Sequence, residues 1–448
     1  MNKVIEVLKN IWKITELKDR ILLTLTMLLV YRFGAQVVLP GIDATKLGQI
    51  AENTEQGILG LLNAFTGGAF ANASVFALGI MPYISASIII QLLGAVIPYF
   101  QRLQKEGELG RRKIIQLTRY GTVIIATMQS IGVSVYLSSL TAPNSDLPIV
   151  TIAPLAFYFV TIITLVTGTI FIMWLGEQIS DYGLGNGISL IIMCGILANL
   201  PFVLQLEWDS GNMSTSPYRY LSLLVLVFFV TLFVVGITTG TRKIPVQYAK
   251  RVVGRKVYGG QATHIPLKIL TTGVMPIIFA QALMFVPNTL ASFWPDSGFS
   301  DFMNNVFSPT HAVYNIFFAI LIIIFTYFYT AIAFNPVDVA DNMKKQGGFI
   351  PGVRPGKATA DYIDKILTRV TLPASLFLGL IAVLPAILFS VFNEEVSYSL
   401  MSFYGGTSLI IIVGVALDTL QQIESHLLMR NYDGFLKSGR IRGRSRRY

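Results

Sequence analysis

Charged side chains are scarce in this sequence. Only 13% of the 448 residues are Asp, Glu, Lys or Arg, whereas 53% are hydrophobic, and the mean hydropathy is +0.62. Soluble domains carry about 25% charged residues, because their surfaces face water. Length alone would allow two or three soluble domains. The shortage of charge excludes that architecture and indicates that lipid surrounds much of the chain.

Groups that carry out chemistry are also scarce. The single cysteine, Cys194, lies in an apolar run and cannot form an intrachain disulfide. His264, His311 and His426 lie far apart and lack metal-ligand spacing. The sequence contains no phosphate-binding Gly-x-x-x-x-Gly-Lys motif and no nucleophile elbow. We therefore expect neither an enzyme nor a metal or other cofactor.

Long apolar runs, by contrast, are abundant. A bilayer-spanning helix needs about 20 mostly apolar residues. The first twenty residues are polar and basic and lead to no cleavage site, so we expect the first apolar run to remain as a membrane anchor. Ten such runs lie near 21–39, 74–96, 117–138, 154–174, 184–203, 220–240, 269–292, 311–332, 371–392 and 403–424. They predict an all-α polytopic membrane protein with ten transmembrane helices.

Basic residues are confined to alternate connections between these runs. Thirty of the 34 Lys and Arg residues fall in the amino-terminal segment, in three even-to-odd connections and in the carboxyl-terminal tail. The opposite loops hold only Lys46 and Arg219. Cytoplasmic loops carry this kind of excess. We therefore expect both termini in the cytoplasm, and the net charge of +10 needs no nucleic-acid partner to explain it.

The apolar stretch 58–98 is too long for a single crossing. Gly67, Gly68 and Asn72 divide it into a short apolar piece and a full span. A short helix on the external side that carries Asn63 can be tucked into a protein cavity. It can equally lie on the outer leaflet, and the sequence leaves both placements open.

A short internal sequence repeat relates the second and seventh runs. GIMPYISA at 79–86 and GVMPIIFA at 273–280 agree at five of eight positions. They lie five spans apart, and this odd offset makes the two repeats run in opposite directions. Inverted repeats with broken helices are typical of a path between two halves. We predict pseudo-symmetric inverted five-helix halves, 1–205 and 206–448, joined on the external side at 204–219; a chance match is the alternative.

Aliphatic residues on several spans are candidates for a constriction. Isoleucines four residues apart share a helix face, and a ring of aliphatic groups can exclude ions by dewetting. The alternative is that these side chains face lipid or pack against neighbouring helices. The candidates are Ile80, Ile84, Ile188, Ile192, Ile278 and Ile411.

Polar residues on the second and seventh spans form a second candidate site. Ser85, Ser87 and Gln91 cluster on the second span, and Gln281 lies at a comparable depth on the seventh. Such residues commonly hold helices together by hydrogen bonds. They can also line a seam that opens.

The long basic connections 241–268 and 333–370 are candidates for partner binding. The positive-inside rule explains the sign of their charge but not their length. The second connection contains PGVRPG at 351–356, a stiff tip that carries Arg354. We expect these connections to form a docking surface for a cytoplasmic partner.

At these residues the chain resembles the SecY family, the channel subunits of the bacterial Sec protein translocase. The resemblance runs from about residue 12 to 436, and its most specific part is GIMPYISASIIIQLL at 79–93. Further matches are KEGELGRRK at 105–113, WLGEQI at 174–179, GNGIS at 185–189, PGVRPG at 351–356, YIDK at 362–365 and GGTSL at 405–409.

The resemblance implies a role for each candidate group. The six isoleucines would form the pore ring, and a short plug helix would lie within about 58–73. Ser85, Ser87, Gln91 and Gln281 would face a lateral gate that admits signal sequences. The plug residues would be Asn63, Phe65, Thr66, Gly67 and Gly68, and the partner-docking residues would be Arg255, Lys256 and Arg354.

The resemblance also implies partners and a location. These are the companion subunits SecE and SecG, the SecA ATPase or the ribosome, unfolded secretory and membrane proteins, and the lipids of the bacterial plasma membrane. One departure concerns the basic pair after Gly254, which is two arginines in the family and Arg255-Lys256 here. Lys256 keeps the positive charge, but it lacks the planar guanidinium with which an arginine can bind a carboxylate or phosphate through two hydrogen bonds. A secondary transporter, with Asp418 as its buried acid, is the competing hypothesis, and an intramembrane protease is the third.

Overall fold

The computed structural model is mostly helical. It describes residues 14–43, 63, 66–142, 145–209, 217–248, 251–253, 256–258, 262–270, 272–291, 298, 302–303, 306–391 and 398–438. A helix occupies each of the ten predicted spans. These helices are α2 (Thr15–Gly34), α5 (Met81–Val96), α7 (Glu108–Ser139), α8 (Pro154–Tyr182), α9 (Gly187–Asp209), α11 (Pro217–Thr239), α12 (Met275–Ala291), α14 (Ala312–Ala333), α16 (Lys357–Val391) and α18 (Thr407–Ser438).

Most of these helices can cross a membrane by length and composition alone. Seven helical stretches of the described chain are long and apolar enough, and an eighth is added if α5 and α6 (Pro98–Lys105), bent by 99° at their junction, count as one span. α12 has only 17 residues, and α2 carries Glu16 in its first turn and Arg32 in its last. The prediction of a helical multi-span membrane protein is confirmed.

The two predicted basic loops are in fact ordered elements. The segment 241–268 contains β3 (Thr241–Tyr248) and β6 (Ala262–Lys268), which pair antiparallel, and β3 also pairs with β7 (Gly348–Phe349). The segment 333–370 contains α15 (Pro336–Lys345) and the first turns of α16. Short strand pairs are β1 (Thr141–Ala142) with β2 (Ser145–Pro148), and β4 (Arg251–Val253) with β5 (Lys256–Tyr258).

A small apolar core holds this basic end together. Ile244 and Val246 alternate with exposed neighbours along β3, as the two-residue period of a strand requires. They pack with Met343 of α15 and with Ile363 and Leu367 of α16. The sequence did not predict this hairpin, because the span search detects lipid-sized apolar runs and not a short amphipathic hairpin.

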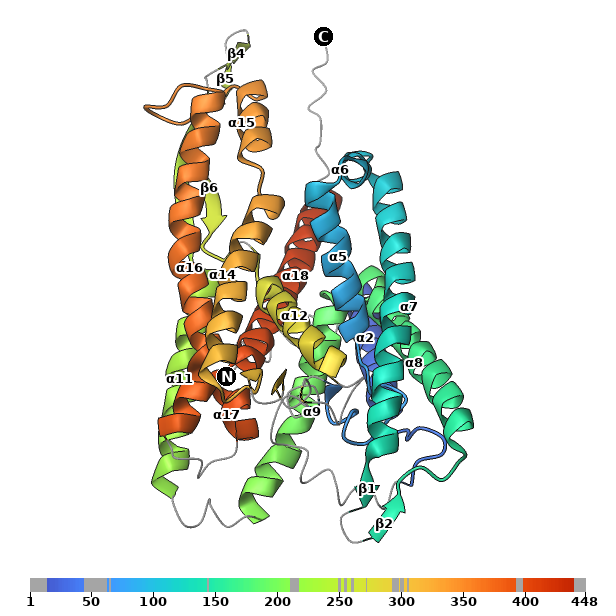
Figure 1. Ribbon diagram of the computed structural model, residues 1–448. Coiled ribbons are helices and arrows are strands. Elements are labelled where there is room, and N and C mark those ends of the chain that lie inside the picture. Colours follow the sequence, from blue (N-terminus) through green and yellow to red (C-terminus); the bar gives the residue numbers. More distant parts are fainter. Residues whose placement is uncertain are drawn as a thin grey trace.

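The helices sort into two groups (Figure 1). α2, α5, α7 and α8 lie on one side, while α11, α14, α16 and α17 (Tyr398–Gly405) lie on the other. α9 packs on α8, and α12 packs on α14. The groups meet where α9 contacts α18 and α17, and where α12 contacts α5 and α7. The division into two halves at residues 205 and 206 stays a prediction.

The two segments of the internal sequence repeat share a backbone conformation. Gly79 and Gly273 have φ values of +55° and +59°, a conformation that favours glycine. α5 begins at Met81 and α12 at Met275, each two residues after its glycine. A shared backbone bend favours a true structural repeat over a chance match of residues.

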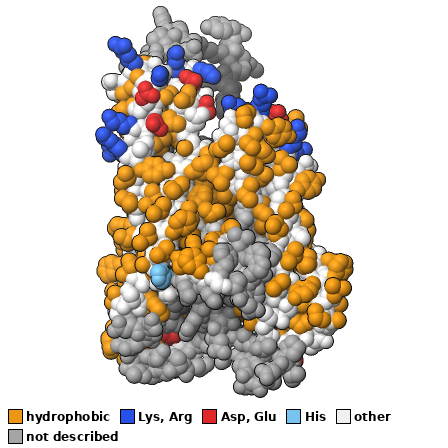
Figure 2. Space-filling model, in the orientation of Figure 1, with side chains coloured by type: hydrophobic (Ala, Val, Ile, Leu, Met, Phe, Trp, Pro, Cys, Tyr) orange, Lys and Arg blue, Asp and Glu red, His pale blue; other side chains and the backbone are white. Residues whose placement is uncertain are grey.

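Charge and apolar surface are segregated along the molecule. Lys and Arg side chains gather at the end that carries α6, α15 and β4, and hydrophobic side chains cover the band below it (Figure 2). Exposed apolar residues such as Leu29, Phe159, Phe229 and Ile316 lie on four different helices. This distribution suits a chain whose sides face lipid.

Candidate functional site

The predicted ring isoleucines share one hydrophobic core. Ile80, Ile84, Ile192, Ile278 and Ile411 are buried in a single cluster, none of them more than 6% exposed. Ile188 is partly buried and packs against the same cluster. These residues come from the start of α5 and from α9, α12 and α18. Their arrangement as a pore ring remains a prediction.

The segment 63–73, which we call the plug segment, is folded on itself. The Asn63 side-chain Oδ1 accepts a hydrogen bond from the backbone N–H of Ala71 at 2.9 Å. The Asn63 carbonyl accepts from the Gly68 N–H at 3.0 Å and from Thr66 Oγ1 at 3.3 Å. Gly67 and Gly68 have φ values of +68° and +88°, which glycine adopts without strain. Of the predicted plug residues, Phe65 lies outside the described part of the chain.

The plug segment touches the backbone beside two ring residues. A Cβ on Gly79, the neighbour of Ile80, would lie 3.0 Å from Thr66 Cγ2. A Cβ on Gly67 would lie 2.9 Å from both Cα and O of Gly195, on the same helix as Ile192. Asn63 and Thr66 are buried, as expected for a piece tucked into the protein. This contact favours the cavity placement of the segment over an outer-leaflet helix.

The carboxyl end of the plug segment is fixed by main-chain hydrogen bonds. The N–H of Leu39 donates to the carbonyl of Ala73 at 2.9 Å, and the N–H of Val75 donates to the carbonyl of Val37 at 2.9 Å. Val38 and Ser74 form an isolated β-bridge between these two bonds. The chain after α2 therefore anchors the base of the segment.

Two of the predicted gate residues form a polar chain that joins α5 to α14. Gln91 Nε2 donates to Ser87 Oγ at 3.0 Å within α5. The hydroxyl of Tyr329 on α14 donates to Gln91 Oε1 at 2.5 Å. The Tyr329 ring lies 4.8 Å from the ring of Phe279 on α12. Sequence reasoning missed Tyr329, because the position of a tyrosine in an apolar run does not show which helix its hydroxyl will face.

The other two predicted gate residues are placed differently. Ser85 is half-buried on α5. Gln281 on α12 is 2% exposed, and its Oε1 has no hydrogen-bond partner among the described residues. A buried acceptor without a partner costs free energy. Gln281 therefore gains from any rearrangement that brings a donor or water to it.

The predicted docking residues are described only in part. Arg255 lies outside the described residues, and Lys256 belongs to β5, whose side chains are not described. Arg354 is exposed in a tight loop bounded by Gly352 and Gly356, whose φ values are +84° and +101°. Thr359 Oγ1 donates to the Arg354 carbonyl at 2.9 Å and braces the loop.

Comparison with known proteins identifies the family of this chain. A protein-family model described as SecY matches residues 74–420. The chain belongs to the SecY family. "Protein translocase subunit SecY" of Haemophilus influenzae is 44% identical over 432 residues, which is 96% of each chain. The Escherichia coli K12 and Thermus thermophilus proteins of that name are 43% and 42% identical, covering 96% and 98% of this chain and 96% and 100% of their own.

Solved structures agree with the SecY fold. One described as "The structure of a protein conducting channel" has a TM-score of 0.61 at 19% identity, and covers 92% of this chain and 93% of its own. "Sec61 in the Canine ribosome-channel complex from the endoplasmic reticulum" has a TM-score of 0.56 at 17% identity, with the same coverage. Membership in this family of translocase subunits confirms the expectation of a transport protein rather than an enzyme.

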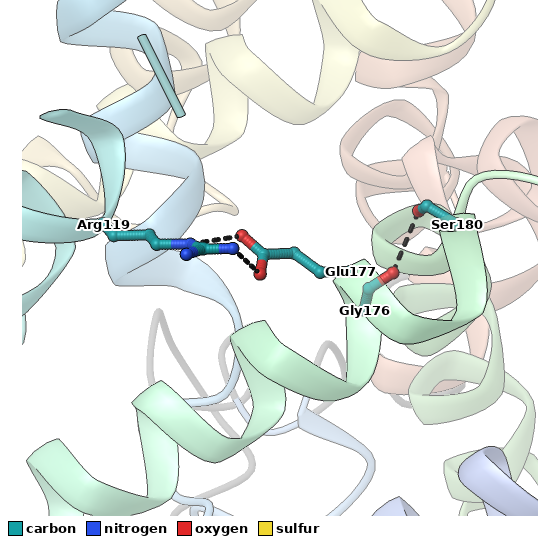
Figure 3. Close-up of polar contacts among 4 residues, drawn as sticks. All are labelled: Arg119, Gly176, Glu177 and Ser180. Atoms are coloured by element: carbon teal, nitrogen blue, oxygen red, sulfur yellow. Dashed lines mark hydrogen bonds and ion pairs between the residues drawn. The ribbon is translucent and has the colours of Figure 1, made fainter. Parts of the chain in front are cut away.

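An ion pair that sequence reasoning missed joins α7 to α8 (Figure 3). Arg119 of α7 donates Nε to Glu177 Oε1 at 3.0 Å and Nη2 to Oε2 at 2.6 Å. One turn further on, Ser180 Oγ donates to the Gly176 carbonyl at 2.9 Å. The sequence predicted Glu177 in a short loop, but α8 continues to Tyr182. Its last turns are polar, so an apolar-run search ends too early.

Proposed function

We propose that this chain is the central pore-forming subunit of a protein-conducting channel. It passes secretory proteins across the bacterial plasma membrane and releases membrane proteins sideways into the lipid. The observation that carries the proposal is the shared core of Ile80, Ile84, Ile192, Ile278 and Ile411, with Ile188 beside it and the plug segment seated next to it.

A ring of isoleucines suits a conduit for many different polypeptides. Fixed polar groups would favour some sequences over others, whereas aliphatic side chains close around any chain. A narrow apolar constriction also holds back ions by dewetting. The plug residues Asn63, Thr66, Gly67 and Gly68, with Phe65 between them in sequence, would cover this ring in the closed state. A related structure with TM-score 0.60 is described as showing that the plug domain of SecY stabilises the closed state and maintains a membrane seal.

The lateral gate would be the seam between α5 on one side and α12 and α14 on the other. Gln91, which bonds Ser87 on the same helix, accepts a hydrogen bond from Tyr329 across it, and Ser85 and Gln281 lie on its flanking helices. A hydrophobic signal helix is more stable in lipid than in an aqueous funnel. It binds the open seam better than the closed one and shifts the balance between them by that difference in affinity.

The basic end would bind the partners that supply energy. Arg354 is exposed there, and Arg255 and Lys256 belong to the neighbouring hairpin region. We propose the SecA ATPase and the ribosome as alternative occupants of this surface, with SecE and SecG as companion subunits. Ribosome-bound Sec61 among the structural relatives supports the second occupant. The gathering of Lys and Arg at this end supports a cytoplasmic location for it and for both termini.

Crosslinking tests the proposal at the gate. In a Cys194→Ser background, Ser87→Cys is paired with a cysteine in the signal helix of an arrested secretory precursor. We expect a disulfide-linked product from Ser87→Cys. The matched control is Thr26→Cys, an exposed position on α2, which should give none. Equal yields at both positions, or none at Ser87, would rule out the gate; saturable solute uptake by the purified chain would favour a secondary transporter instead.

A further inference from the structure

Two consecutive side chains of α2 hold the plug segment by its main chain. The hydroxyl of Tyr31 donates to the carbonyl of Thr66 at 3.3 Å. Nη1 of Arg32 donates to the carbonyl of Gly67 at 2.5 Å. Both donors come from the last turn of one helix, and both acceptors lie 35 residues further along the chain.

Each donor is held in place by its surroundings. Tyr31 is 2% exposed, and its ring stacks on Phe76 with centroids 6.1 Å apart and planes 7° from parallel. A Cβ on Gly34 would lie only 2.1 Å from the Phe76 ring, so α2 approaches this ring as closely as glycine allows. The Tyr31 hydroxyl is thereby directed at the plug segment rather than at lipid.

Arg32 is an unusual residue for a spanning helix. A charged side chain within a membrane is costly and is usually kept for function. Among the described residues, no carboxylate lies within 4 Å of its guanidinium. Its partner is the Gly67 carbonyl, and a hydrogen bond from a charged donor is stronger than one between neutral groups. The Arg32 charge thus contributes to the position of the plug segment.

The two ends of the plug segment are therefore attached in different ways. Its base is attached by the main-chain bonds of Leu39 and Val37 to Ala73 and Val75. Its tip at Thr66 and Gly67 is attached by side chains. Side-chain bonds to a tip can break while the base stays paired, so the segment can swing without unfolding its anchor.

We propose that Tyr31 and Arg32 form a plug catch: two positioning residues that keep the tip seated in the closed channel and let it go when the channel opens. This proposal rests on the channel function proposed above. The catch binds main-chain carbonyls, so it does not depend on the side chains of the plug. Substitutions of plug side chains should therefore disturb closure less than substitutions of the two α2 residues.

Ion leak through the resting channel tests whether Tyr31 and Arg32 keep the plug seated. The full chain with its companion subunits is placed in planar bilayers, as wild type and as Arg32→Gln, Arg32→Lys and Tyr31→Phe. We expect Arg32→Gln to raise the resting conductance about tenfold, equivalent to about 1.4 kcal/mol in the closed–open balance. Tyr31→Phe should raise it about threefold. Arg32→Lys, which keeps a charged donor, should lie between wild type and Arg32→Gln.

Matched controls separate the catch from a general loss of donors. Arg20→Gln removes an arginine that bonds the Gly183 carbonyl at the other end of α2. Tyr158→Phe removes a hydroxyl that bonds Ser138 between α7 and α8. Both controls should leave the conductance within about twofold of wild type. Controls that leak as much as the α2 variants would overturn the catch.

A second measurement reports the position of the plug without using conductance. Thr66, at the tip that Tyr31 and Arg32 hold, is 2% exposed. In a Cys194→Ser background, Thr66→Cys should therefore react slowly with a water-soluble maleimide. Adding Arg32→Gln should raise the labelling rate severalfold. An unchanged labelling rate together with unchanged leak would refute the catch.

Deletion of residues 63–72 distinguishes the failure of the catch from the failure of the channel proposal. If this deletion raises the conductance while the α2 variants do not, the catch alone is wrong. If the deletion leaves the conductance unchanged, the plug role itself is wrong and the catch fails with it. A leak that rises in the deletion and in the α2 variants, with faster labelling of Thr66→Cys when Arg32→Gln is added, supports both.

Discussion

At the scale of single residues, the fold determines which polar side chains form hydrogen bonds to other segments. Gln91 was predicted from its cluster on the second span, but its partner Tyr329 was not. Arg32 stood alone in the first span, and only the fold shows that it bonds the Gly67 carbonyl. A pattern along one helix locates a polar group, whereas its partner on another helix depends on how the two pack.

The hydroxyl of Tyr329 gives a prediction at this scale. Tyr329→Phe removes the hydrogen bond to Gln91 across the seam and keeps the ring on Phe279. A hydrogen bond of this kind contributes about 1 kcal/mol, so the open seam should become about fivefold more populated. We expect better export of a reporter whose signal sequence has been made less hydrophobic.

The control for this prediction is Tyr327→Phe, two residues away on α14, for which the structure gives no hydrogen bond in the described part of the chain. It should leave export unchanged. Export by Tyr329→Phe at or below the wild-type level would show that this hydroxyl does not hold the seam closed.

At the scale of elements, the extent of each helix differed from the apolar run that predicted it. α16 begins at Lys357, well before the predicted span at 371–392, and α8 continues through Glu177 to Tyr182. The polar extensions stand clear of the apolar band and pair with other elements. A hydropathy search cannot find them, because they are polar and are held by tertiary contacts.

The ion pair between α7 and α8 gives a prediction at this scale. Arg119→Gln and Glu177→Gln, alone and together, form a double-mutant cycle. We expect a coupling free energy of about 1 kcal/mol, because the contact is bidentate and the Glu177 side chain is only 17% exposed, while solvent screens the half-exposed Arg119. The measurement is the unfolding midpoint of each variant in detergent micelles.

The pair Arg111–Glu108 serves as its control. Its closest atoms are 3.7 Å apart, and both side chains are more than 70% exposed. Its coupling should be close to zero. Equal coupling in the two pairs would show that Arg119 and Glu177 do not join α7 to α8.

At the scale of the whole molecule, two helix groups meet around a shared apolar core. α5 and α9 contribute Ile84 and Ile192 to it, and α12 and α18 contribute Ile278 and Ile411. α5 contacts α12, and α9 contacts α18, so these isoleucines lie on pairs of helices that touch each other.

Ion leak through the ring gives a prediction at this scale. Ile84→Gly with Ile278→Gly removes aliphatic bulk from both halves at once and should raise the resting conductance in planar bilayers at least several-fold, because a wider constriction stays wet. The control pair is Ile89→Gly with Ile316→Gly, which are 49% and 62% exposed on α5 and α14. Unchanged conductance in the first pair, or equal leak in the control pair, would exclude a ring at these positions.

The sequence by itself determined the lipid environment, the helical multi-span architecture and the basic end, and its motifs indicated the family. Each of these depends on local composition: apolar length sets a span, and the placement of Lys and Arg sets the polarity of the molecule. It also located the glycine bend that recurs before α5 and α12.

Only the tertiary structure decided which groups meet. Tyr31 and Arg32 reach the plug segment, Tyr329 reaches Gln91, and Arg119 reaches Glu177. All these contacts join residues far apart in sequence, and their formation depends on helix rotation and crossing, which a periodic apolar pattern leaves undetermined. The hairpin of β3 and β6 likewise needed α15 and α16 to cover its apolar face.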